Sequence, residues 1–179
     1  MPEAMQLLRG RGANANRQII DAYAAWAKDP EAVNARKLLL ASLFKEPNIA
    51  QKLSDVLAAV EADPTPPEHD PVWPYLTQML ASLWTKETAS PGMDLVLAEK
   101  RPRARRALFS SFVLVANNPE TLDELTTEQR QTLTETMIDI GPELIASQKA
   151  EQQAALKSLR AHLHAITLKE GQQEAYPNE

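Results

Sequence analysis

Residues 47–71 read PNIAQKLSDVLAAVEADPTPPEHDP. The apolar side chains of the first part recur at the spacing i, i+4, i+7, i+8, i+11, which lines one face of an α-helix: Ile49, Leu53, Val56, Leu57 and Val60. The four prolines of residues 64–71 exclude a helix or strand there and favour an extended, semi-rigid loop over residues 63–71. This stretch therefore predicts a buried helix that a proline loop ends.

The same pattern recurs along the chain, because Pro30, Pro47 and Pro64 are 17 residues apart, as are Pro102 and Pro119. Proline is favoured in the first turn of a helix, and Asp29 is suited to cap a helix that begins at Pro30. The prolines and the apolar spacing together predict helices over 14–28, 30–45, 47–62, 71–87, 90–100, 102–116, 126–140 and 142–170, with one further turn at 119–125. Gly141-Pro142 is expected to separate the last two helices.

The predicted fold class is all-α, with about eight helices in antiparallel pairs. The chain holds 27 Ala and 23 Leu among 179 residues, and we find no convincing period-two alternation of apolar residues. Helix pairs of about 34 residues are typical of HEAT and tetratricopeptide stacks, so a short α-solenoid is one arrangement. The defining residues of the tetratricopeptide, ankyrin and leucine-rich motifs are absent, which leaves an irregular helical bundle as the alternative.

The predicted domain organisation is a single all-α domain over residues 14–170. Residues 1–13 are polar and basic and predict a flexible arm, and residues 171–179 predict a disordered tail. We find neither the apolar core of a signal peptide nor an apolar run of about 20 residues. The expectation is a cytoplasmic protein that does not associate with membranes.

The residues that usually carry catalysis are scarce. There is no cysteine, and the three histidines do not form a metal-binding pattern, because His162 and His164 are two apart on a helix and His69 is alone in the proline loop. Motifs for nucleotide phosphates and for a nucleophilic serine are missing as well. We therefore expect no enzymatic activity, no metal and no cofactor.

The sharpest polar feature is the sequence KRPRARR at residues 100–106, called the basic segment below. It is flanked by residues 61–99, with one basic and seven acidic side chains, and by residues 119–179, with five and eleven. Cations at the start of a helix oppose the helix dipole, so an acidic surface at 119–128 or an external partner is expected to compensate them. Five residues are candidate partner-binding residues: Lys100, Arg101, Arg103, Arg105 and Arg106.

A second candidate surface is the aromatic pair of Pro71-Val72-Trp73-Pro74-Tyr75. Tryptophan and tyrosine are favoured at protein interfaces, and a rigid proline loop would present them at low entropic cost. The alternative is that Trp73 covers the core of its own fold. Trp73 and Tyr75 are accordingly added to the candidate partner-binding residues.

Helix pairs, segregated charge and few chemically competent groups favour a non-enzymatic protein-interaction module, such as an adaptor, an inhibitor or immunity-type protein, or a regulatory subunit. Its expected partner is a protein with an acidic surface. The alternative function is a nucleic-acid-associated regulator that uses the basic segment. A homodimer formed through the long C-terminal helix is a further alternative.

Overall fold

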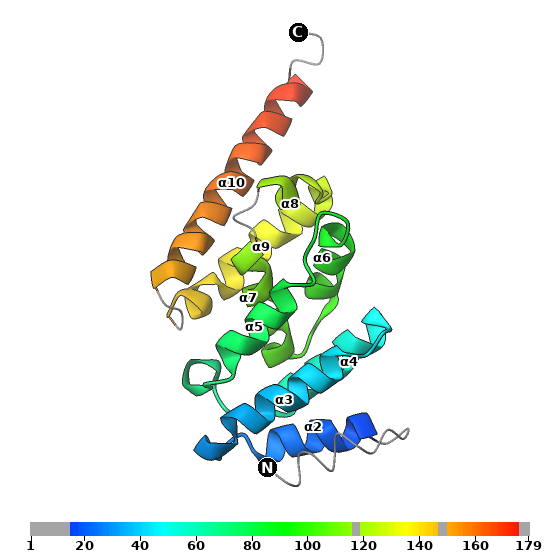
Figure 1. Ribbon diagram of the computed structural model, residues 1–179. Coiled ribbons are helices and arrows are strands. Elements are labelled where there is room, and N and C mark those ends of the chain that lie inside the picture. The colour runs from blue at the N-terminus through cyan, green and yellow to red at the C-terminus, as the bar shows by residue number, and fades with distance from the viewer. Residues whose placement is uncertain (1–14, 116–118, 147–149, 176–179) are drawn as a thin grey trace. The chain divides into compact units, whose positions relative to one another are not determined.

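In the computed structural model, residues 15–115, 119–146 and 150–175 are described. This part of the chain consists of nine α-helices and two one-turn 3-10 helices, and it contains no strand (Figure 1). The predicted all-α class is confirmed. The elements are α2 (Ala15–Ala25), η1 (Pro30–Ala32), α3 (Val33–Phe44), α4 (Ile49–Ala62), η2 (Pro67–His69), α5 (Trp73–Ala81), α6 (Ala89–Ala98), α7 (Pro102–Val115), α8 (Pro119–Asp123), α9 (Thr127–Ala146) and α10 (Ala150–Ala175).

The chain divides into two compact units. Unit 1 comprises Met1–Gln78 and Lys100–Ala107, and unit 2 comprises Met79–Glu99 and Leu108–Glu179. In unit 1, α2 packs against α3 and α4, and these helices bury a shared apolar core that includes Ile19, Tyr23, Leu39, Leu40, Leu43, Val56 and Val60. In unit 2, α9 packs against α6 and α10, and the buried side chains include Trp84, Met93, Phe109, Phe112, Leu133, Met137, Leu156 and Leu163.

Helix starts follow the expected local chemistry. The Asp29 carboxylate caps η1 by accepting a hydrogen bond from the Glu31 N–H, with Pro30 at the first position, as predicted. The Thr126 hydroxyl accepts from the Gln129 N–H at 3.1 Å, and the Gln129 side chain accepts from the Thr126 N–H at 3.0 Å. This reciprocal capping box begins α9 where the sequence places a helix start.

Four details differ from the predicted elements. The helix α9 continues through Gly141-Pro142 to Ala146, so this pair does not separate the last two helices: a proline disturbs the backbone hydrogen bonding of one turn, and the helix resumes beyond it. The helix α5 is shorter than residues 71–87, and the proline loop contains the 3-10 turn η2. Ile49 is 51% exposed rather than buried, since it is the first residue of α4. The helix α10 extends to Ala175, past residue 170 where the predicted domain ends. The predicted arm over residues 1–13 lies outside the described residues.

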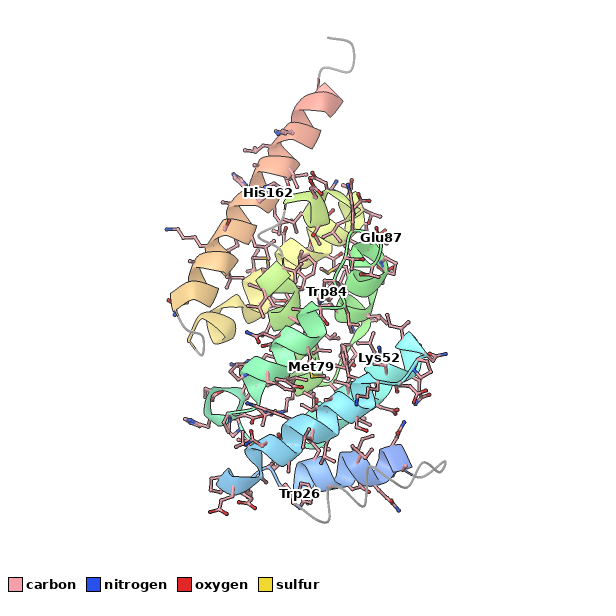
Figure 2. The ribbon with its side chains drawn as sticks, viewed as in Figure 1. Trp26, Lys52, Met79, Trp84, Glu87 and His162 are labelled. Atoms are coloured by element: carbon pink, nitrogen blue, oxygen red, sulfur yellow. The ribbon has the colours of Figure 1, made fainter. Side chains whose placement is uncertain are left out.

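One close contact fixes the packing of α6 in unit 2. Trp84, labelled in Figure 2, donates its indole N–H to the Ser111 hydroxyl at 3.0 Å. Its ring lies edge-to-face with the Phe112 ring, with 4.9 Å between the two ring centroids. A Cβ added to Gly92 of α6 would lie 2.5 Å from Cζ3 of this tryptophan. Since Trp84 is held on its other sides, the position needs glycine for space rather than for backbone freedom.

We expect Gly92→Ala to lower the free energy of unfolding by about 1–3 kcal/mol, because the added methyl group overpacks against Trp84. Gly171→Ala is the matched control, since Gly171 also lies in a helix but a Cβ there would meet no atom within 4 Å. That variant should gain about 0.5–1 kcal/mol from helix propensity. Urea unfolding followed by circular dichroism measures both changes, and equal effects would contradict the proposed packing.

Candidate functional site

The basic segment lies in unit 1 at the start of α7, which begins at Pro102 as predicted. Lys100 and Arg101 are exposed, and Arg105 and Arg106 are half-buried. The side chain of Arg103 is only 10% exposed. The candidate residues of the basic segment therefore differ in their access to solvent, and Arg103 is the one turned into the fold.

Arg103 is neutralised by carboxylates of the proline loop (residues 63–71). Its Nη2 lies 2.7 Å from Oδ2 of Asp70 and 3.2 Å from Oδ2 of Asp63, and its Nη1 donates to the carbonyl oxygen of Thr65. The sequence predicted that residues 119–128 or an external partner would compensate the charge of the basic segment. For Arg103 the compensating groups are instead Asp63 and Asp70. The guanidinium instead closes the loop of its own unit, which removes Arg103 from the surface offered to a partner.

A second arginine, Arg36 of α3, completes this arrangement. Its Nη1 donates to Oδ1 of Asp70 at 3.0 Å, its Nη2 binds Oδ2 of Asp63, and its side chain is 1% exposed. The two carboxylates also accept backbone N–H groups, Asp63 from Thr65 at 2.8 Å and Asp70 from Val72 at 2.9 Å. Arg36, Asp63, Asp70 and Arg103 are called the buried cluster below.

Arg36 is not among the residues predicted for the site. A signal was present, because Arg36 stands three, four and seven residues before Leu39, Leu40 and Leu43, on the apolar face of the same helix. A charged residue in such a position is rarely buried unless an opposite charge is buried with it. That signal asks for a partner carboxylate but does not say which one.

The predicted aromatic residues lie beside cations of the same unit. The guanidinium of Arg103 is 5.1 Å from the centroid of the Trp73 ring, and Nζ of Lys37 is 5.6 Å from that of Tyr75. Both aromatic side chains are half-buried. Trp73 thus adjoins the basic segment through Arg103, so the two predicted candidate surfaces are brought together in unit 1.

Tyr23 of α2 lies beneath the buried cluster, with the Arg36 guanidinium 4.6 Å from the centroid of its ring. Its hydroxyl is buried and has no hydrogen-bond partner among the described residues. Burial raises the pKa of this phenol above its ordinary value of 10.0, against the opposing effect of Arg36. Burial therefore keeps the phenol of Tyr23 neutral at neutral pH.

The arrangement of the buried cluster is suited to fixing the proline loop and presenting the charges of the basic segment.

In the described part of the chain, no group of three or more His, Asp or Glu side chains is placed to hold a metal ion. None of the described helices is long and apolar enough to cross a membrane. No protein-family model, curated protein or solved structure matches the chain significantly.

We expect Arg36→Met to lower the free energy of unfolding by about 3–5 kcal/mol, because it leaves two buried carboxylates facing one guanidinium. Arg17→Met is the control, since the Arg17–Asp21 pair is exposed and its loss should change stability by less than about 0.5 kcal/mol. Urea unfolding measures both variants. A small effect of Arg36→Met would show that the buried cluster contributes little to the fold.

The neutral phenol of Tyr23 predicts a dependence on alkaline pH. Because its pKa is raised in the folded protein, its contribution to stability is complete below pH 10 and is lost as the pH rises above that value, where the unfolded chain ionises first. Tyr23→Phe should remove this component and leave stability at pH 7 nearly unchanged, because the hydroxyl has no partner to lose. Unfolding free energies of the two proteins between pH 8 and 11 test this, and parallel curves would contradict it.

Proposed function

We propose that the protein is a non-enzymatic interaction module that binds an acidic protein surface through its basic segment. The observation that carries the proposal is the anchoring of this segment. Arg103 is held by Asp63 and Asp70 of the buried cluster, and the N–H of Ala104 donates to Oε2 of Glu61 at 3.0 Å. The exposed Lys100 and Arg101 therefore stand beside a fixed point of the fold.

Anchoring favours recognition because a preorganised surface loses less conformational freedom when it binds. Arginine also suits a carboxylate partner, since its planar guanidinium forms paired hydrogen bonds with two oxygens. Trp73 lies against Arg103 at the edge of this surface, and tryptophan and arginine are enriched among the residues that dominate binding energy. These features support a protein interface built from a few positioned side chains.

The internal contacts of two arginines of the basic segment favour a protein partner over nucleic acid. Binding to a phosphate backbone gains strength with the number of cations that contact it. Arg103 and Arg106 both face carboxylates of the proline loop, so the basic segment offers fewer cations than its sequence suggests. Cytoplasmic location and a solenoid arrangement of the helices remain predictions from the sequence.

The proposal is tested with the double variant Lys100→Glu/Arg105→Glu and a fluorescein-labelled poly-L-glutamate peptide. Fluorescence anisotropy at low salt should show a loss of affinity of about tenfold, because two attractive contacts become repulsive. The control is Lys28→Glu/Lys45→Glu, which makes the same change in net charge at exposed positions of unit 1. Equal losses would indicate a general charge effect and contradict the proposed surface.

An oligo(dT) strand measured in the same way separates the two kinds of partner. We expect the wild-type protein to bind it more weakly than poly-L-glutamate. Tight, salt-sensitive binding of the strand that the double variant abolishes would assign the basic segment to nucleic acid instead.

A further inference from the structure

The outer face of α9 is acidic and carries an exposed apolar side chain. Glu128, Gln131, Glu135 and Ile138 recur at the spacing i, i+3, i+7, i+10, which places them on one face of the helix, and all four are exposed. Every exposed charged side chain described in α9 is acidic, and Ile138 is 69% exposed. This face is therefore complementary to a surface that is basic and partly apolar.

The outer face of α10 has the opposite charge in the same order. Lys157, Ala161, His164 and Leu168 recur at the spacing i, i+4, i+7, i+11, and all four are exposed. Residues 152–169 contain no Asp or Glu, and every exposed charged side chain described in α10 is basic. Leu168 is 56% exposed, second only to Ile138 among the large apolar side chains of the described residues. The two most exposed of these apolar side chains thus lie on two faces of opposite charge.

The two faces match position by position when the helices are laid parallel. In chain order from Glu128 and Lys157, the four residue numbers of the α10 face exceed those of the α9 face by 29, 30, 29 and 30. This alignment brings each carboxylate opposite a basic side chain and Ile138 opposite Leu168. It extends over residues 128–138, which is about 15 Å of helix. Opposite charges and an apolar contact both favour association in this alignment.

Within one chain the two helices cannot meet in this way. They lie side by side in opposite directions, because Nη2 of Arg160 in α10 donates to the carbonyl oxygen of Met137 in α9 at 3.1 Å and these residues are about equally distant in sequence from residues 147–149 (Figure 1). Glu128 is then level with residue 169, so about 12 residues, or about 18 Å along the helix axis, separate it from Lys157. A second copy of the chain supplies the parallel helix.

We propose that unit 2 forms a twofold-symmetric dimer in which α9 of each copy lies parallel to α10 of the other copy. Twofold symmetry forms both contacts at once, since each copy offers both faces. A dimer through two α10 helices, the alternative drawn from the sequence, would instead set basic faces against each other. Among the described residues, no ion pair involves Glu128, Lys157 or His164, so their charges are available to the second copy.

Sedimentation equilibrium of the full chain tests the dimer. The wild type should dimerise below about 1 mM at low salt, and more weakly as salt screens the charges. Glu128→Lys and Lys157→Glu should each raise the dissociation constant about tenfold, because symmetry makes two contacts repulsive. The controls Glu31→Lys and Lys28→Glu make the same changes in net charge at exposed positions of unit 1, and they should change it less than about twofold. All four side chains are exposed, so thermal melting should be nearly unchanged.

A mixture of the two unit 2 variants identifies the pairing. Equal amounts of Glu128→Lys and Lys157→Glu should form a heterodimer about as tight as the wild-type dimer, because both contacts regain opposite charges. A wild type that is monomeric at about 1 mM would overturn the inference. A dimer that neither variant weakens would overturn it too, since it would use another surface, and so would a mixture that stays monomeric. The proposed function, which concerns unit 1, is independent of these outcomes.

Discussion

The buried cluster joins three segments that are distant in sequence, and unit 1 depends on it. Arg36 comes from α3, the carboxylates come from the two ends of the proline loop, and Arg103 comes from the first turn of α7. A single buried charge is strongly unfavourable, and opposite charges offset the cost of desolvation only when all of them are in place. The three segments must therefore adopt their positions together, and the cluster selects one arrangement of them.

The proline loop illustrates why side chains rather than backbone hold this part of the fold. Pro64, Pro66 and Pro67 carry no N–H group, so the loop has few donors with which to form regular structure. The side chain of Asp63 binds the next available N–H, that of Thr65, and the Thr65 carbonyl receives Arg103. At Thr65 both backbone polar groups are thus satisfied by charged side chains, whereas residues 66–70 form backbone hydrogen bonds within η2.

The sequence was most informative where a local rule decides the structure. Asp29-Pro30, Pro102 and the pair Thr126 and Gln129 begin helices by caps and first-turn preferences that act within a few residues. The same reasoning failed at Gly141-Pro142, where α9 continues, because the effect of a proline depends on the residue before it and on the helix around it. Local rules therefore predicted the elements better than their exact ends.

The candidate site was harder to predict, because its side chains come from segments that are distant in sequence and meet only in the folded chain. Arg36 and Arg103 are brought together by carboxylates between them in the sequence, and a loop of prolines and acids looks solvated when considered alone.

The basic segment combines an internal anchor and an exposed charged surface within a few residues, and under the proposed function this combination constrains how it would recognise a partner. A flexible basic arm adapts to many anions but becomes ordered at the cost of conformational entropy. Here the charge of Arg103 is already neutralised inside the fold by Asp70. The positions of Lys100 and Arg101 follow from that anchor. Under the proposed function, a partner would have to match this fixed charge arrangement, so that specificity would arise from geometry rather than from net charge.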